Sequence, residues 1–572
     1  MFNRTYGKGR NLLSVDTLSF KTDSISCANP KWKELALNGI IDKDGHIANI
    51  GVQLSGLGTL NIDDFKFFVE NNNSWEQIAV ANNGFEKIKG SSSEIKDWTA
   101  FASKFDYILD SIKSSEGKYS LQLSCLNNSK LFNESPSASY RQKERIFEGL
   151  FIQFPLVLFS FQGHTQPYAG KKSEEEFKME MSKTLGDVKE MDPYMLLTDL
   201  INVWNIIKHF YPYNDEIPLE SWDSRLTEYI EKMHLVKTEA QYKNMLLTFL
   251  MPTQDGHVFL YKDLEEIFGI PLKIDLIDGK FVVKQIIKGR MDADLKLGDV
   301  VLRINDTPSH KYFNEIVGTI LGSPQYKEES ALQSFFKGPF DSEVKLTVSN
   351  GLDSSVTRDI YFRRESIFVE DFDSTPKNLP DDVVYVNLSN TIISEDYLKD
   401  HNYFDGKKVI VDVRGHPIDD PLPLLKHLLK ENDATEWGYK PKIIYPDYKN
   451  VTYLTSGWSL KYELPHINAK VVFLSDASSI SASESILSFA KYYKLGKIIG
   501  AATAGANGNV RKIELLSGFK FMMSGLKIMG LDGSKQQGIG ILPDIIVKKD
   551  YHDIKNGRDR VLISALDYLN KK

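Results

Sequence analysis

Residues 471–484 read VVFLSDASSISASE, an apolar segment that runs through a serine-rich turn toward a helix. The apolar start is typical of a buried strand, and the helix is expected to continue to Leu495. The first amides of a helix lack intrahelical partners and lie at the positive end of its dipole, so they can bind an oxyanion. Ser481, at the start of this helix, is therefore the candidate nucleophile.

The same spacing has a second interpretation. Ser481 and Glu484 lie three residues apart, as in a capping box whose two side chains only start the helix. A hydroxyl bonded to its own helix is a poor nucleophile, but Ser478 and Ser479 could take over the capping. The motif alone leaves both roles open.

Strands and helices alternate around this segment. Strands are expected at 383–388, 408–413, 471–474 and 498–500, with helices at 421–430 and 481–495. This order predicts an α/β core with a largely parallel sheet, in which ligands bind at the carboxyl ends of the strands. Two polar loops, 414–417 and 475–481, follow such strands and should open on one crevice.

The rest of the chain divides by its hydrophobic period. Period-two alternation broken by Gly, Asn, Asp and Ser predicts β-sandwich modules over 1–165, the second starting near Gly84. Charged residues without apolar period predict a linker over 166–191. After the cap Asp192-Pro193, apolar residues at helical spacing predict a helical unit over 192–257. Its first helix starts at 192, and two more are expected at 222–233 and 239–250. Residues 258–366 return to strands, and 367–572 hold the α/β core and a C-terminal helix.

The strands of 258–366 follow a glycine-containing loop, Phe268–Leu272. This segment resembles a PDZ domain, in which such a loop binds a peptide C-terminus while the peptide adds a strand to the sheet. The resemblance implies that Gly269 and Ile270 contact substrate. A small β-domain that only packs against its neighbours is the alternative.

Composition excludes some functions. The chain has 572 residues, 42% of them hydrophobic, and a formal net charge of -7, which suits a multidomain globular protein and argues against an electrostatic nucleic-acid binder. Cys27 and Cys125 have no histidines at ligand spacing, so no metal site or disulfide framework is indicated, although one bridge between them is possible. No apolar run is long enough to span a membrane, and no signal peptide is recognised; a trimmed exported protein would look the same.

Several motifs together resemble, in order, the tricorn-core and C-terminal-processing peptidase family. The similarity covers roughly 190–550, and the order of the motifs makes it more specific than any one of them. The motifs are Trp204-Asn205, His209–Tyr213 (HFYPY), Asp255-Gly256-His257, the PDZ-like segment, Asp412–Gly415 (DVRG), Ser479–Glu484 and Gly538–Asp544 (GIGILPD).

Two catalytic schemes occur in that family. The processing-protease branch uses a lysine in a Gly-Lys-Gly motif, and the matching position here is Ala506, so a Ser–Lys dyad is not expected. The tricorn-like branch uses a histidine, and His257 matches it. A serine hydroxyl is scarcely ionised at neutral pH and needs such a neutral imidazole to take its proton. Without the other motifs, His257 would be taken for a loop histidine with only a structural role.

The chain departs from the tricorn-like branch at two positions. That branch has a serine before the histidine and a glutamate before the Gly-x-Gly-Ile-x-Pro-Asp turn, and these positions hold Gly256 and Gln537. The resemblance thus assigns Gln537 to the catalytic group, but an amide cannot supply the negative charge that stabilises an imidazolium. Asp255 is an alternative acid.

The resemblance also supplies the oxyanion hole and further substrate contacts. The backbone amides of Ala482 and Gly415 would hold the oxyanion, and glycine allows the backbone to approach a substrate closely. Arg414 and His416 flank the expected crevice and would contact substrate. Gly415 could equally be an ordinary turn glycine, and both flanking side chains could be paired on the surface.

The sequence therefore predicts a serine peptidase that hydrolyses polypeptides through Ser481 and His257, with no cofactor and no metal. No nucleic-acid partner is expected, the oligomeric state is open, and a periplasmic or extracellular location is expected. One alternative is an impaired peptidase fold that binds peptides or other ligands, since related folds bind retinoids. Another is a carbohydrate or cell-surface binding protein that works through its sandwich modules.

Overall fold

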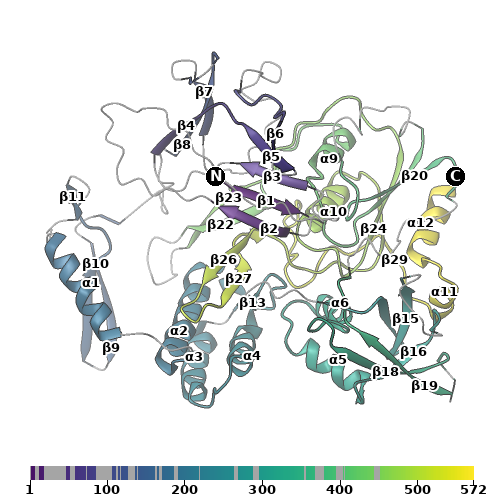
Figure 1. Cartoon of the computed structure of the whole chain (residues 1–572), viewed down its shortest axis with the longest axis horizontal. Coiled ribbons are helices and arrows are strands. Elements are labelled where there is room, and N and C mark those ends of the chain that lie inside the picture. The colour runs from purple at the N-terminus through teal and green to yellow at the C-terminus, as the bar shows by residue number, and fades with distance from the viewer. Residues whose placement is uncertain are drawn as a thin grey trace. The chain divides into compact units, whose positions relative to one another are not determined.

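The computed structural model contains two compact units, Met1–Ser135 and Pro136–Lys572 (Figure 1). Within the described residues, no helix is both long and apolar enough to cross a membrane. The described residues are 2–6, 12–17, 47–51, 58–71, 74–85, 106–110, 114–115, 117–125, 136–137, 140–147, 149–161, 164–165, 171–185, 191–217, 219–262, 268–287, 295–352, 354, 356–367, 376, 379–393, 398, 404, 406–442 and 451–571.

The described parts of the first unit are antiparallel strands, as the alternating sequence predicts. Much of the predicted sandwich region lies outside the described residues, so the packing of these sheets into a sandwich stays a prediction. Cys27 also lies outside them. The strands are β1 (Phe2–Tyr6), β2 (Leu12–Thr17), β3 (Ile47–Gly51), β4 (Gly58–Ile62), β5 (Phe67–Asn71), β6 (Ser74–Ile78), β7 (Asp106–Asp110) and β8 (Ser120–Cys125).

The second unit begins with short strands and one helix. Helix α1 (Lys171–Leu185) occupies much of the range 166–191, so the prediction of a linker is wrong for these residues. The helix was missed because its charged sequence lacks a clear apolar face. The remaining residues of that range, 166–170 and 186–190, lie outside the described residues. The strands before the helix are β9 (Arg141–Phe147), β10 (Leu150–Pro155), β11 (Ser160–Phe161) and β12 (His164–Thr165).

The helices predicted for 192–257 are confirmed. Asp192 caps α2 by accepting the amides of Tyr194 and Met195 at 2.9 and 3.2 Å, and Thr238 caps α4. This unit shares one apolar core with a strand pair from much later in the chain, to which Phe521 and Met523 belong. The elements are α2 (Pro193–Phe210), η2 (Asn214–Glu216), α3 (Leu219–Met233), α4 (Glu239–Leu250), η3 (Met251–Thr253), and the sheet β13 (Phe259–Tyr261), β27 (Lys520–Ser524) and β26 (Val510–Glu514).

A second sheet, antiparallel throughout, occupies the region predicted as a β-domain. Helices α5 and α6 pack on it around a core that includes Phe335. The sheet order is β14 (Leu272–Ile277), β15 (Lys280–Ile286), β16 (Val300–Ile304), β18 (Glu343–Ser349) and β19 (Thr357–Arg363), with β17 (Thr307–Pro308) beside β16; the helices are α5 (Ser309–Val317) and α6 (Pro324–Ser334).

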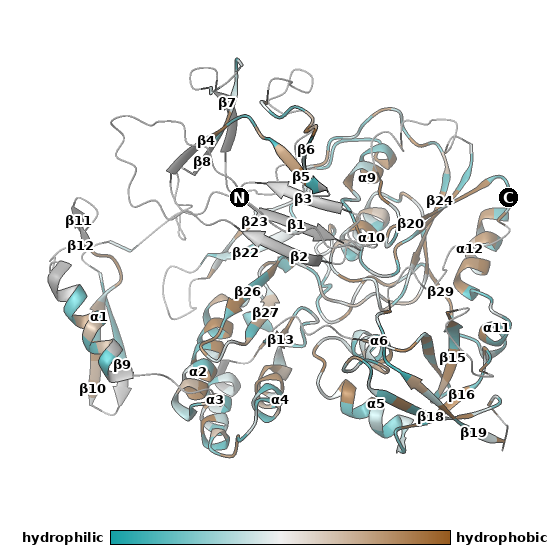
Figure 2. Cartoon of the chain, viewed as in Figure 1, coloured by the Kyte–Doolittle hydropathy of each residue, from teal (hydrophilic) through white to brown (hydrophobic). Residues whose placement is uncertain are grey.

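The predicted parallel sheet is confirmed, with helices on both faces. Alternate residues of β24 point to opposite faces: Phe473 packs in the core with α9 and α10, and Val472 packs with α12. Figure 2 shows the hydrophobic character of these inner strands. The elements are β20 (Val383–Asn387), β21 (Lys408–Asp412), α9 (Leu422–Leu428), β24 (Lys470–Ser475), α10 (Ala482–Tyr492), β25 (Lys497–Gly500), β29 (Ile545–Ile546) and α12 (Arg560–Asn570).

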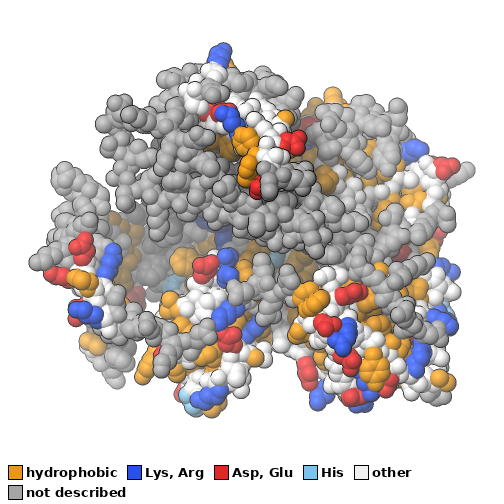
Figure 3. All heavy atoms as spheres, in the orientation of Figure 1, with side chains coloured by type: hydrophobic (Ala, Val, Ile, Leu, Met, Phe, Trp, Pro, Cys, Tyr) orange, Lys and Arg blue, Asp and Glu red, His pale blue; other side chains and the backbone are white. Residues whose placement is uncertain are grey.

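The remaining elements are β22 (Gly438–Lys442), β23 (Thr452–Ser456), β28 (Lys527–Ile528) and α11 (Tyr551–Lys555). On the face drawn in Figure 3, acidic and basic side chains are interspersed over the helical unit and over the six-stranded sheet.

Candidate active site

The turn between β24 and α10 leaves the candidate nucleophile, Ser481, partly exposed. Ser481 has φ 59°, a conformation that non-glycine residues adopt rarely, at a sharp strand-to-helix turn. Its amide donates to the carbonyl of Ala506 at 3.0 Å. The hydroxyl makes no capping hydrogen bond to α10, so the capping-box role of Ser481 is wrong for this side chain. A hydroxyl that does not cap its own helix can act in chemistry.

Glu484 holds a neighbouring loop instead of completing a capping box with the Ser481 hydroxyl. Its buried carboxylate accepts the Thr503 hydroxyl and the amides of Gly505 and Ala506, the last two at 2.8 and 2.9 Å. Burial raises the pKa of Glu484 to about 7, against the lowering effect of these donors. Because Ala506 also binds the Ser481 amide, Glu484 fixes the loop that positions the candidate nucleophile.

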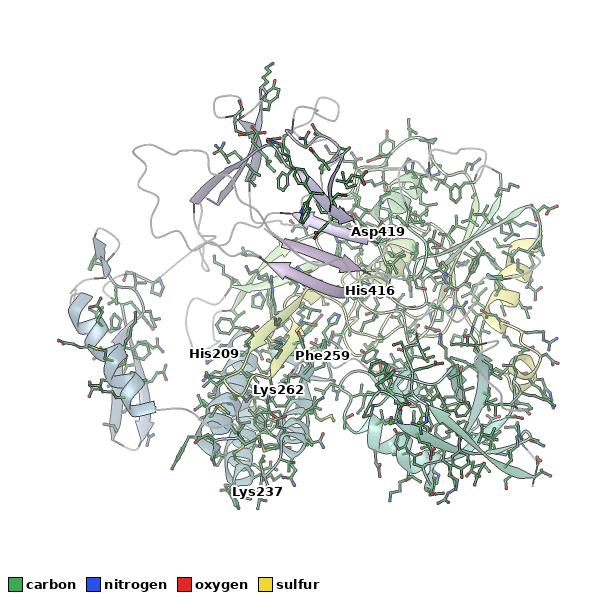
Figure 4. All side chains as sticks on the ribbon, in the orientation of Figure 1. His209, Lys237, Phe259, Lys262, His416 and Asp419 are labelled. Carbon is green, nitrogen blue, oxygen red and sulfur yellow. The ribbon has the colours of Figure 1, made fainter. Side chains whose placement is uncertain are left out.

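His257 is buried, with 5% of its surface exposed, in the turn between η3 and β13. Its amide donates to Asp255 Oδ1 at 2.9 Å, and its Nδ1 lies 2.9 Å from Ser524 Oγ, on a residue 267 positions away. Pairing of β13 with β27, the strand that ends at Ser524, brings these segments together. Phe259, the first residue of β13, is labelled in Figure 4.

The hydroxyl of Ser524 links His257 to a buried carboxylate. Ser524 Oγ donates to Asp255 Oδ1 at 3.1 Å, and the Ser524 amide donates to Asp255 Oδ2 at 3.1 Å. Because an ionised carboxylate only accepts, the Ser524 oxygen is left to accept the Nδ1 proton of His257. This tautomer leaves Nε2 as the basic nitrogen. Burial lowers the pKa of His257, Asp255 opposes that effect and His416 adds to it, so the imidazole is neutral at pH 7.

The segments of His257 and Ser481 meet at Ala506. A Cβ placed on Gly256 would lie 2.9 Å from Tyr326 Cε1 and 3.0 Å from the Ala506 Cβ, and the Ala506 carbonyl accepts the Ser481 amide. The contacts at residue 256 are too close for a serine, the residue that the tricorn-like branch carries there. Here Ser524 supplies the hydroxyl that contacts the imidazole.

The loop after β21 lies beside the serine-rich turn, as predicted from the carboxyl ends of neighbouring strands. Gly415 has φ 89°, which suits glycine, and its amide donates to Ser478 Oγ at 2.8 Å. The Ser483 hydroxyl donates to the Gly415 carbonyl at 2.7 Å. Ala482 is the first residue of α10, where helix amides lack intrahelical acceptors.

The two flanking side chains of this loop differ. Arg414 binds Asp412 and also Asp559, the N-cap of α12, at 2.8 Å, and these carboxylates hold the pKa of its guanidinium well above the usual value despite burial. Arg414 thus joins the loop to α12, a structural role that the sequence could not separate from substrate contact. His416 is exposed; its Nδ1 lies 2.8 Å from the Pro417 carbonyl (Figure 4).

Three other predicted residues are placed as follows. Gly269 exchanges backbone hydrogen bonds with Glu365 at 3.0 and 2.9 Å, so its amide is already donated, and the Ile270 side chain is buried. Gln537 is 5% exposed, and neither polar atom of its side chain has a hydrogen-bond partner in the described part of the chain. Gln537 is thus not hydrogen-bonded to His257. Ser524 makes the contact with the imidazole instead.

Sequence reasoning missed Ser524 and the contact of Ser478 with Gly415. A single hydroxyl within the apolar run FMMSG was a weak signal for Ser524, and no local pattern pairs Ser478 with residue 415. No group of three or more His, Cys, Asp or Glu side chains that could hold a metal ion occurs among the residues that the structure covers.

Comparisons with known proteins found one family match and several solved structures of similar fold. Residues 394–547 match the model of peptidase family S41. Two structures of mature CPAF, the second complexed with lactacystin, are similar to this chain at 13% identity, with TM-scores of 0.51 and 0.52. Each alignment covers 66% of this chain, and the alignments cover 96% and 97% of the two CPAF chains. A photosystem II D1 C-terminal processing protease matches at 16% identity with a TM-score of 0.37, over 64% of this chain and 98% of that one. No curated protein matches the sequence.

Proposed function

From the match of residues 394–547 to peptidase family S41, a family of serine-type hydrolases, we propose that the chain hydrolyses polypeptides with Ser481 as nucleophile and His257 as general base. The observation that carries the proposal is the hydrogen bond from His257 Nδ1 to Ser524 at 2.9 Å. This contact supports a neutral imidazole whose Nε2 accepts the Ser481 proton in the proposed reaction.

We assign the acid of the site to Asp255, which acts on His257 through Ser524. When Nε2 takes the Ser481 proton, the imidazole becomes a cation, and a buried carboxylate one hydroxyl away stabilises it. Asp255 is fully buried and accepts the His257 amide, the Ser524 amide and the Ser524 hydroxyl. Gln537 carries no charge and has no such partner in the described residues, so the role implied for it by resemblance passes to Asp255.

In the proposed reaction, Ser481 Oγ attacks the scissile carbonyl carbon as its proton moves to His257 Nε2. The resulting oxyanion is held by the amides of Ala482 and Gly415. His257 then gives its proton to the leaving amine, and the acyl-enzyme forms. A water molecule, deprotonated by the same nitrogen, hydrolyses the ester and restores Ser481.

The antiparallel sheet with β14 at its edge is proposed to bind substrate as a PDZ-like domain. Its edge strand β14 contacts α6, and the proposed peptide would add to the open edge of β14. The Gly269 amide is occupied by Glu365, so the carboxylate of such a peptide would use other amides of this loop. His416, exposed beside Gly415, is proposed as a substrate contact. The N-terminal sandwich modules and a periplasmic or extracellular location remain proposals from the resemblance.

A fluorophosphonate probe tests the proposed nucleophile and base. The full chain is expected to be labelled once, at Ser481, and Ser481→Ala is expected to abolish labelling. His257→Ala should slow labelling by ~10²-fold or more because the hydroxyl then loses its base. Labelling that persists in Ser481→Ala, or a wild type that never reacts while folded, would contradict the proposal.

A further inference from the structure

We propose that the Ser478 hydroxyl competes with substrate for the oxyanion hole. In the free enzyme this hydroxyl occupies the Gly415 amide, and it slows acylation until substrate displaces it. This inference rests on the proposed function. An amide has one proton, and the Gly415 N–H donates it to Ser478 Oγ at 2.8 Å. The same proton cannot bind a substrate oxyanion at full strength, so the hydroxyl has to turn away before the hole is complete.

The environment of Ser478 makes its oxygen a good acceptor. Its hydroxyl proton is donated to Asp476 Oδ1, and its own amide donates to the same oxygen at 2.9 Å. A hydroxyl that donates to a carboxylate is polarised, and its oxygen then accepts more strongly. Asp476 therefore strengthens the contact between Ser478 and Gly415.

The other serines of the turn have a different role. Ser475 and Ser479 donate to the carbonyls of Ala501 and Val413, each at 2.9 Å, and Ser483 donates to the carbonyl of Gly415 at 2.7 Å. These bonds hold the backbone of the turn and the peptide plane of Gly415. Ser478 differs because its oxygen accepts an N–H that the proposed reaction needs.

Release of the Gly415 amide needs only a side-chain rotation. Ser478 is partly exposed, and its backbone stays tied to Asp476 through the Ser478 amide. Rotation about χ1 moves the hydroxyl away from Gly415 while the bond from Ser483 keeps the Gly415 peptide in place. A substrate carbonyl that becomes negatively charged offers the amide a stronger acceptor than a neutral hydroxyl does.

The test measures the second-order rate of fluorophosphonate labelling of the full chain at pH 7. Ser478→Ala is expected to react about fivefold faster than wild type, since one competing neutral hydrogen bond is removed. Asp476→Asn is expected to accelerate labelling less, because an amide polarises the hydroxyl less than a carboxylate does. Ser564→Ala removes a hydroxyl from α12 that donates to the Arg560 carbonyl and serves as the matched control, with the wild-type rate.

Thermal unfolding shows whether each variant is folded. If Ser478→Ala does not fold, the labelling rate of Asp476→Asn tests the proposal in its place. Folded Ser478→Ala that reacts at the wild-type rate or more slowly overturns the competitor role and leaves the peptidase proposal intact. If neither wild type nor Ser478→Ala reacts, both proposals are overturned.

Discussion

At the scale of single residues, the hydroxyl of Ser524 connects the proposed base, His257, with the proposed acid, Asp255. It accepts from His257 and donates to Asp255, and the crowded position 256 cannot provide this hydroxyl. Ser524→Ala is expected to slow fluorophosphonate labelling by ~10²- to ~10⁴-fold, the range that a well-placed base contributes, because Nδ1 loses its acceptor and the imidazole its preferred tautomer. Labelling rates of wild type and variant measure this effect.

Gln537 provides the matched control for that prediction. Gln537→Leu removes two buried polar atoms that have no partner among the described residues, so the free energy of unfolding is expected to stay equal or rise. Its labelling rate is expected to stay within about threefold of wild type, as for a change outside the reacting groups. A large loss in Gln537→Leu together with a small loss in Ser524→Ala would return the catalytic role to Gln537.

The protonation of His257 predicts a pH dependence. Burial lowers its pKa below 6.5, and only the neutral imidazole accepts a proton. The labelling rate should therefore stay constant as pH falls through 6.5 and decline only below that value. Asp255→Asn removes the charge that raises this pKa, so the decline should move to still lower pH while the plateau falls. A midpoint above 6.5 in wild type would contradict the assigned environment of His257.

At the scale of elements, the start of α10 and the loop 503–506 are joined by one buried carboxylate. Glu484→Gln keeps one acceptor oxygen but turns an NH₂ group toward donors, so it should lower the free energy of unfolding by about 1–3 kcal/mol. The pKa of Glu484 rises from 4.5 to about 7 on folding, so the folded state binds the extra proton in this range. Its contribution to stability is greatest at acid pH and falls as pH rises from about 4.5 to 7.

Chemical denaturation at pH 5 and pH 7 checks this prediction. The difference in stability between wild type and Glu484→Gln should be larger at pH 5 than at pH 7. Ser564→Ala, which removes a hydroxyl that donates to the Arg560 carbonyl on α12, is the control and should change the stability equally at both pH values. An equal difference at both pH values would mean that Glu484 does not take up a proton on folding.

Elements with a strong local signal were predictable from the sequence. The structure contains the cap Asp192-Pro193, the helix at 239–250 and the strand followed by a helix around 471–484. These were predictable because the spacing of apolar residues and the capping of a helix are local properties of the sequence. The capping role of Ser481 was not decided by sequence. Whether its hydroxyl bonds to α10 depends on φ at Ser481 and on the loop at Ala506, which lies outside any local window.

At the scale of the molecule, the site depends on contacts between distant segments. His257 meets Ser524 because the helical unit and the β26–β27 pair form one core, and Asp199 of α2 binds the amides of Leu516 and Ser517 at 2.7 and 2.9 Å. The order of motifs predicted Ser481 and His257 as partners. It could not predict Ser524, because only strand pairing places that hydroxyl beside the imidazole.

The division into two compact units predicts that residues 136–572 carry the activity alone. The hydrogen bonds that build the site all join residues of this unit, from Asp255 to Ser524, and a compact unit with its own core can fold independently. The fragment is expected to be labelled within about twofold of the full-chain rate, because every group proposed for the reaction belongs to it. Labelling kinetics and thermal unfolding of both proteins measure this, with Ser481→Ala in the fragment as the control. A folded fragment that reacts much more slowly would show that residues 1–135 act on the site.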